Sequence, residues 1–283
     1  MTDIGRRHII TGALAGGAAL AVASKAGAQT GASVVEGTPA AGPAPQLKGQ
    51  PNAEAQGIQS ALQDFNDPKA LAVQPVGNDW AQLRRYHLAN IETAKLPDSQ
   101  RRVVMMGDSI TDGWPGQSGN FYADNGLIGR GIGGQVSAQM LVRFMADVVG
   151  LGAEVVHIMA GTNDIAQNQD PYDPVATTNN LQAMASLASI HGIKVILASV
   201  PPADHFPWRP EVGNPVEKIR ALNVWIKSIC EAQGYTYVDY WPALATANGS
   251  LRPNFGNDGV HPNAIAYAAM APYTLAAIDT AMV

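Results

Sequence analysis

The 283-residue chain contains one cysteine, few charged residues and no run of basic residues. The single cysteine, Cys230, excludes an internal disulfide, and its apolar neighbours predict a buried thiol in a helix. A nucleophilic thiol would need a positive environment, which the surrounding sequence does not supply. Charged residues make up 14% of the chain and the formal net charge is −5. This charge argues against a nucleic-acid partner and favours a neutral substrate.

Motifs for metal and cofactor binding are also scarce. The six histidines form no H-E-x-x-H pattern and no Cys/His cluster, so we expect no metal ion and no cofactor. Residues 129–134 match the G-x-G-x-x-G pattern of dinucleotide-binding turns, but they follow the second predicted strand instead of the first. Glu154, the acidic residue about 20 positions later, precedes its strand instead of ending it. Nucleotide binding is therefore only the minor alternative.

Residues 1–28 have the features of an export signal. The pair Arg6-Arg7 precedes an apolar stretch (residues 9–23), and residues 26–28 provide the small side chains of a cleavage site. The adjacent arginines resemble a twin-arginine signal, and an ordinary secretory signal is the alternative. The apolar stretch is too short and too rich in Gly and Ala to span a bilayer. We therefore expect an exported protein, periplasmic or secreted, without a stable membrane span.

Composition divides the remaining chain in two. Residues 29–78 are rich in Ala, Gly, Pro and Gln, which predicts a disordered linker with at most a short helix near residues 58–65. The folded domain is predicted to span residues 79–283. It is expected to begin with a helix capped by Asn78 or Asp79, because four residues recur at helical spacing: Trp80, Leu83, His87 and Ile91.

Short strand-like runs alternate with longer helical ones through this domain. Strands are predicted at 103–106, 127–129, 155–159, 195–199 and 236–238, and helices near 136–149, 175–191, 215–233 and 263–281. The continuous apolar run at 194–200 is typical of a strand covered on both faces. The alternation predicts an α/β fold, a three-layer αβα (flavodoxin-like) sandwich with a five-stranded parallel sheet in the order 2-1-3-4-5. The site of such a sheet lies beyond the carboxyl ends of the strands.

Residues suited to a serine hydrolase site occur at two points of this domain. Ser109 directly follows the first strand, which would present its hydroxyl to a substrate. Asp258 lies three residues before His261, and an aspartate can hold an imidazole as the base that activates a serine. Each feature alone has a simpler explanation as a strand-end turn, an N-cap or a helix cap. Their combination favours a serine hydrolase site.

Four blocks resemble the SGNH (GDSL) hydrolase family and occur in the family's order: Gly107-Asp-Ser-Ile110, Gly131-Ile-Gly-Gly134, Gly161-Thr-Asn-Asp164 and Asp258-Gly-Val-His261-Pro262. They span essentially the whole predicted domain. The resemblance implies a fold of SGNH hydrolase type, with Ser109 as the nucleophile and His261 as the general base. It implies that Asp258 orients the imidazole and stabilises its charged form.

The same resemblance implies an oxyanion hole, which stabilises the negative charge of a tetrahedral intermediate. Its donors would be the backbone N–H groups of Ser109 and Gly134 and the side-chain amide of Asn163. Gln135 departs from the family pattern, in which an acidic residue or Asn is common after the block glycine. This departure puts the local hydrogen bonding in question, and not the oxyanion role.

The substrate pocket is predicted from aromatic residues near the site. The loop at 201–210 contains four prolines together with Phe206 and Trp208, and Trp114 and Asp108 lie close to Ser109 in sequence. We expect these four side chains to form the pocket wall. The alternative for the loop is a surface segment tucked under its own aromatic rings.

The chain is also similar to bacterial exported acetylesterases and to platelet-activating-factor-acetylhydrolase-like esterases. The resemblance implies a serine esterase that hydrolyses short-chain (acetyl) esters through an acyl-enzyme, on carbohydrate or other small soluble substrates. The alternatives are a lysophospholipase, arylesterase or thioesterase acting on longer acyl chains, and a non-catalytic envelope-binding protein on the same scaffold. The sequence does not predict the oligomeric state.

Overall fold

Five parallel strands form the centre of the structure, a computed structural model that describes residues 79–283. The strands are β1 (Val103–Gly107), β2 (Leu127–Gly131), β3 (Val155–Met159), β4 (Lys194–Ala198) and β5 (Thr236–Val238). Their order is β2-β1-β3-β4-β5, which confirms the predicted sheet. The first three strands pair in register, with Val103 of β1 opposite Leu127 of β2 and Val155 of β3.

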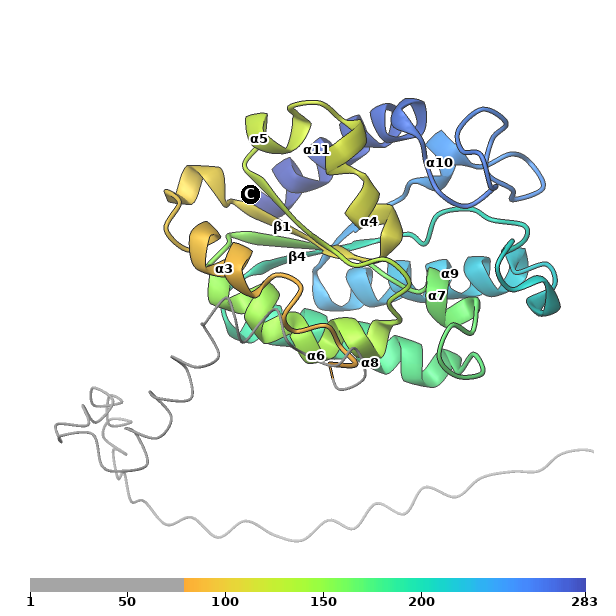
Figure 1. The fold of residues 1–283 in the computed structure, drawn as a ribbon, viewed down its shortest axis with the longest axis horizontal. Coiled ribbons are helices and arrows are strands. Elements are labelled where there is room, and N and C mark those ends of the chain that lie inside the picture. Colours follow the sequence, from red (N-terminus) through yellow and green to blue (C-terminus); the bar gives the residue numbers. More distant parts are fainter. Residues whose placement is uncertain (1–78) are drawn as a thin grey trace, which may run out of the picture. The chain divides into compact units, whose positions relative to one another are not determined.

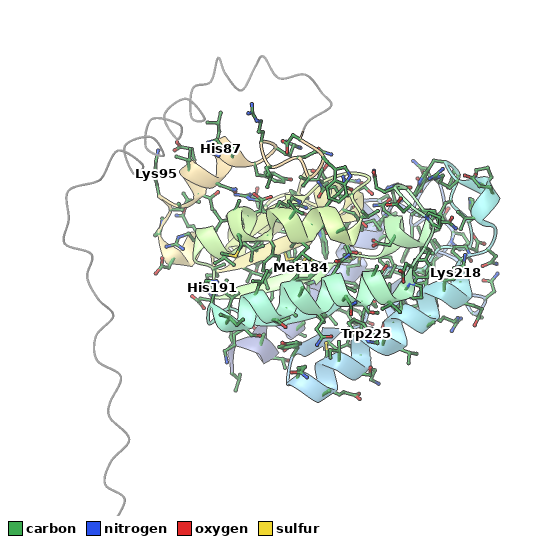
Figure 2. The ribbon with its side chains drawn as sticks, turned by 90° about the horizontal axis from the view of Figure 1, so that it is seen from below. His87, Lys95, Met184, His191, Lys218 and Trp225 are labelled. Carbon is green, nitrogen blue, oxygen red and sulfur yellow. The ribbon has the colours of Figure 1, made fainter. Side chains whose placement is uncertain are left out.

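Helices cover both faces of this sheet (Figure 1). One face packs against α6 (Ser137–Asp147), α8 (Pro174–Ile190) and α9 (Val216–Gln233), and Figure 2 shows this side with Met184 of α8 and Trp225 of α9. The other face packs against α4 (Ser109–Gly113), α5 (Phe121–Asp124), α10 (Trp241–Leu244) and α11 (Ala264–Met282). Shorter elements are α3 (His87–Thr93), α7 (Thr162–Ile165) and the 3₁₀ turns Asp98–Gln100, Pro115–Gln117, Val149–Leu151 and Pro210–Val212.

Alternate side chains of the buried strands supply two separate apolar cores. Val104 and Met106 of β1 point to the core shared with α6, α8 and α9. Val103 and Met105 point to the core shared with α4 and α11. Every residue of β1 and β3 is buried, as expected for strands of a parallel sheet that is covered on both faces.

The helix predicted from Asp79 is wrong for its first two turns, because α3 begins only at His87. Gln82 has φ +55°, in the left-handed region, and this conformation interrupts a right-handed helix. The carbonyl of Ala81 accepts a hydrogen bond from the Gln135 side chain at 2.9 Å, and the carbonyl of Trp80 accepts one from Gln139 at 2.7 Å. Contacts with distant residues therefore replace the predicted helical hydrogen bonds.

The predictions for residues 1–78, which are the signal, the linker and the short helix, lie outside the described residues. Within residues 79–283, no helix combines the length and the apolar character that a bilayer crossing needs.

A buried ion pair joins α6 to the sheet. Arg143 and Asp147 lie one turn apart on α6, with 2.9 Å between Arg143 Nη1 and Asp147 Oδ2, and both side chains are fully buried. The guanidinium also donates to the main-chain carbonyls of Gly107 (3.0 Å) and Arg130 (2.9 Å). Asn90 of α3 donates to the second oxygen of Asp147 at 2.6 Å. The pair therefore connects strands β1 and β2 to the helices α6 and α3.

Asp147→Ala is expected to lower the free energy of unfolding by about 3–5 kcal/mol, because it leaves the Arg143 charge buried without its carboxylate. Urea denaturation of the two proteins measures this difference. The control is Glu231→Ala, which removes the partner of Lys227 at the same helical spacing but on the exposed surface. That loss is expected to stay below about 1 kcal/mol. Equal losses in the two variants would contradict the prediction.

A buried histidine of β3 makes the fold sensitive to acid. Burial lowers the pKa of His157 from 6.5 to about 4, and its Nε2 lies 2.8 Å from the hydroxyl of Tyr240. Between these two pH values the unfolded chain binds a proton that the folded protein does not. The contribution of His157 to stability is therefore present above pH 6.5 and falls by about 3 kcal/mol as the pH approaches 4.

Between pH 6.5 and 4, the free energy of unfolding of His157→Gln is expected to fall by about 3 kcal/mol less than that of the unmodified protein. Asp108 also contributes to the pH dependence, because burial raises its pKa from 3.8 to about 6. The slope of the unfolding free energy against pH is therefore compared between His157→Gln and the unmodified protein. Asp108 therefore takes up its proton in the folded state first, which stabilises the protein as the pH falls through 6. Urea midpoints measured at several pH values give both slopes, and parallel slopes would refute the role of His157.

Candidate active site

Ser109 stands where β1 passes directly into α4, at the carboxyl end of the sheet (Figure 1). Asp108 is the N-cap of α4 and accepts a hydrogen bond from the N–H of Ile110 at 2.9 Å. The strand and the helix approach each other so closely that a Cβ at Gly107 would lie 2.1 Å from the hydroxyl oxygen of Thr111. A glycine is therefore required in this turn, and the turn fixes the direction of the Ser109 side chain.

The side chains of Ser109, His261 and Asp258 form a continuous hydrogen-bonded chain. The distance from Ser109 Oγ to His261 Nε2 is 2.8 Å, and that from His261 Nδ1 to Asp258 Oδ2 is 2.6 Å. The His261 and Asp258 side chains are each more than one-third exposed, so solutes can reach them. This arrangement can take a proton from the serine hydroxyl and hold the resulting imidazolium.

A short turn fixes the carboxylate of Asp258. Its Oδ1 accepts hydrogen bonds from the backbone N–H groups of Val260 (3.0 Å) and His261 (2.8 Å). Partial burial raises the pKa of Asp258, but these bonds and the one from the His261 ring outweigh it and hold the pKa below its ordinary value. Gly259 has φ +77°, which the turn needs, and a Cβ there would also collide with the ring of His205.

Gly134 and Asn163 follow β2 and β3 and lie at the same end of the sheet. Gly134 has φ +78°, in the region that favours glycine. A Cβ at the preceding Gly133 would lie 3.8 Å from the Cβ of Ser109, so this turn packs directly against the serine. The Asn163 side chain is buried and donates from Nδ2 to the carbonyl of Gln135 at 3.1 Å. The structure thus brings together all five residues of the predicted triad and oxyanion hole.

Both the oxygen and the nitrogen of the Gln135 side-chain amide are hydrogen-bonded. Its Oε1 accepts from Nε of the buried Arg143 at 2.6 Å, and its Nε2 donates to the carbonyl of Ala81. The side chain therefore links the glycine turn of the site to the α6 ion pair. Asp164 holds the opposite side of this turn, since its carboxylate accepts from both the N–H and the hydroxyl of Ser137 at the start of α6.

Asn168 joins the site in a way that sequence reasoning missed. Its side chain contacts Asn163, Gly134 and Trp208 through three hydrogen bonds. No local signal marks this residue, because two of its three partners, Gly134 and Trp208, come from loops that are distant in the sequence.

The predicted pocket wall needs correction at three of its four residues. Trp114 is fully buried in the core, where it stacks on Tyr267 with 5.2 Å between ring centroids. Asp108 is also buried, because its carboxylate caps α4. Phe206 is buried behind Trp208, with 5.4 Å between the two rings. Trp208 alone of the four reaches the surface: it is 39% exposed and its ring lies 5.6 Å from that of His261.

Other reactive groups do not extend this site. Within residues 79–283, no group of three or more His, Cys, Asp or Glu side chains is arranged to hold a metal ion. Cys230 lies in α9 away from these loops, and burial raises the pKa of its thiol to about 12.

The chain is similar to several solved structures. A GDSL-like lipase from Bacteroides thetaiotaomicron has 42% sequence identity, and the match covers 71% of this chain and 98% of that chain with a TM-score of 0.68. An acylhydrolase candidate from Bacteroides fragilis has 40% identity, with 72% and 99% covered and a TM-score of 0.69. A mutant of an acetylxylan esterase from Geobacillus stearothermophilus shares the fold at 19% identity, with 64% and 95% covered and a TM-score of 0.51.

The comparison with curated proteins gave no match. The family model of GDSL-like lipases and acylhydrolases matches residues 105–269, which include the serine, the glycine turn, Asn163 and the Asp258–His261 turn. The chain belongs to the GDSL-like lipase/acylhydrolase family.

Proposed function

We propose that the protein is a serine esterase that hydrolyses short-chain esters through an acyl-enzyme. The hydrogen-bonded chain from Ser109 to His261 to Asp258 carries this proposal. His261 Nε2 takes the hydroxyl proton as Ser109 Oγ bonds to the ester carbonyl carbon. The same proton then passes to the leaving alkoxide, which departs as the alcohol. A water molecule repeats the sequence on the acyl-enzyme and releases the carboxylic acid.

The oxyanion of each tetrahedral intermediate would be held by the Ser109 and Gly134 N–H groups and by the Asn163 amide. Fixed donors stabilise the charge that develops in the transition state, since they need no reorganisation when it appears. The burial of Asn163 and the packing of the glycine turn against Ser109 support this role.

For the substrate, we propose an acetyl ester of a carbohydrate or another small soluble molecule. The half-exposed ring of Trp208 beside His261 offers a flat apolar surface on which the C–H face of a sugar ring can pack. Phe206 supports this ring from behind. The fold shared with an acetylxylan esterase is compatible with such a substrate. Longer acyl chains are the second candidate, and the family's lipase members favour that alternative.

Hydrolysis rates for p-nitrophenyl acetate, butyrate, octanoate and palmitate test the acyl preference. We expect kcat/KM to be highest for acetate and to fall with chain length. Acetate release from acetylated xylose oligomers then tests the alcohol part of the ester. A rate that rises with acyl-chain length would instead favour a lipid substrate. No hydrolysis of any ester, with no labelling of Ser109 by a fluorophosphonate, would favour the non-catalytic binding protein.

Activity is expected to fall in acid and to persist at mildly alkaline pH. A protonated His261 cannot accept the serine proton, so the reactive form is the neutral imidazole. Initial rates with p-nitrophenyl acetate across pH 4–9, in buffers of constant ionic strength, measure this profile. A maximum near pH 4 would contradict a histidine base.

We also propose that the enzyme acts outside the cytoplasm. The basis is the sequence of residues 1–28, with its arginine pair and small-residue cleavage pattern. Fractionation of cells that express the full chain tests it: a shortened protein outside the cytoplasm is expected, and full-length protein inside would contradict it.

A further inference from the structure

The side chain of Asn168 connects the two oxyanion donors that do not come from Ser109. Its Nδ2 donates to Asn163 Oδ1 at 2.7 Å and to the carbonyl of Gly134 at 3.2 Å. A primary amide has two N–H groups, so these two bonds use all of its donor capacity. One side chain thus holds both the peptide of Gly134 and the amide of Asn163.

These contacts decide which way the Asn163 amide points. With Oδ1 held by Asn168 and one N–H bound to the carbonyl of Gln135, the second N–H of Asn163 stays available for a ligand. A flipped amide would set its NH₂ group against the NH₂ of Asn168 and its oxygen against the carbonyl of Gln135. Both contacts would be repulsive, so Asn168 locks the orientation that donates.

The remaining acceptor of Asn168 is held by the loop that faces the substrate. Trp208 Nε1 donates to Asn168 Oδ1 at 2.9 Å, while the Trp208 ring lies beside His261. The neighbouring Arg209 donates to the carbonyl of Gln167, whose φ of +59° turns the chain just before Asn168. The loop at 201–210 therefore contacts two adjacent residues of the segment after α7, Gln167 and Asn168.

We propose that Asn168 is a positioning residue: it fixes the orientation of the Asn163 amide and the Gly134 turn, and it couples them to Trp208. This inference rests on the proposed function, since it concerns the oxyanion hole of the same reaction. It adds a residue that touches neither the substrate nor the reacting atoms. Its effect appears where the oxyanion is bound, in kcat and in the affinity for tetrahedral adducts.

Two substitutions separate the parts of this role. Asn168→Asp keeps the shape and the acceptor for Trp208 but places a carboxylate oxygen against Asn163 Oδ1, which drives the Asn163 amide to flip. Asn168→Ala removes the lock without the repulsion. The matched control is Asn125→Asp, because Asn125, which follows the end of α5, donates to only one backbone carbonyl, that of Phe121.

The measurements are kcat and KM for p-nitrophenyl acetate, the inhibition constant of phenylboronic acid, and the thermal midpoint. We expect kcat to fall by more than about 10-fold in Asn168→Ala and further, toward the about 100- to 1000-fold loss typical of a missing oxyanion donor, in Asn168→Asp. KM is expected to change less than about 3-fold, since the acyl group still binds. Boronate affinity is expected to weaken in the same order as kcat, because its adduct on serine is tetrahedral and carries an oxyanion.

Two results would overturn the inference. One is unchanged kcat and boronate affinity in both Asn168 variants. The other is a loss of activity that follows the loss of folded protein, with boronate affinity unchanged in the folded fraction. Ser109→Ala is measured alongside: an active Ser109→Ala would refute the proposed function itself, whereas an inactive one with fully active Asn168 variants would refute only the role of Asn168.

Discussion

Ser109→Ala is expected to lower kcat for p-nitrophenyl acetate by about 10⁶-fold, the largest effect of any single substitution in this protein. The change removes one oxygen atom from the first residue of α4. The N-cap of that helix is the Asp108 side chain, which stays in place, so the fold around the site is retained. What is lost is the atom that would bond to the acyl carbon, and His261 then has no hydroxyl to activate.

The control for this substitution is Ser118→Ala. Ser118 follows the 3₁₀ turn Pro115–Gln117, and its buried hydroxyl has no hydrogen-bond partner among the described residues. Its rate is expected to equal that of the unmodified protein, and thermal midpoints of the two variants should agree within a few degrees. If Ser109→Ala kept more than a tenth of the activity, another nucleophile would have to be sought.

Asp258→Asn is expected to lower kcat by about 10⁴-fold. The carboxylate now accepts three hydrogen bonds, from the N–H groups of Val260 and His261 on one oxygen and from the His261 ring on the other. An asparagine keeps the two backbone contacts with its single oxygen, so its NH₂ group faces the ring at Nδ1. The ring then carries its proton on Nε2, which is the atom that must accept the serine proton.

Asp173→Asn is the matched control for that experiment. Asp173 is the N-cap of α8 and accepts from two backbone N–H groups, as Asp258 does, but it contacts no histidine. Asparagine is as good an N-cap as aspartate, so neither stability nor kcat is expected to change. Rates measured under saturating p-nitrophenyl acetate separate the two variants. An Asp258→Asn protein within tenfold of the normal rate would show that the imidazole is oriented by other contacts.

The sheet could be predicted from the sequence because β1, β3 and β4 are short, largely apolar runs separated by longer helical segments. β1 and β3 are buried on both faces, so their sequences carry no alternation that could confuse them with a surface strand. The site followed from the same property, since a parallel sheet gathers the residues after its strands at one edge. The sequence therefore predicts correctly that Ser109, Gly134 and Asn163 lie at this edge.

The features that could not be predicted depend on contacts between distant segments. Trp114 lies in the core because α11, far along the chain, brings Tyr267 against its ring. Residues 79–86 leave the predicted helix because Gln135 and Gln139 bind their carbonyls. Asn168 finds its partners only when the third strand's loop meets the loop at 201–210. Local spacing contains none of this information.

The position of the Asp258–His261 turn has a consequence for the timing of synthesis. Ser109, Gly134 and Asn163 follow the first three strands, whereas His261, the proposed general base, lies just before the last helix, α11. A ribosome therefore makes the serine about 150 residues before the histidine that activates it. Under the proposed mechanism, the growing chain lacks its base until that final segment leaves the ribosome and docks, and we expect it to be inert toward esters until then.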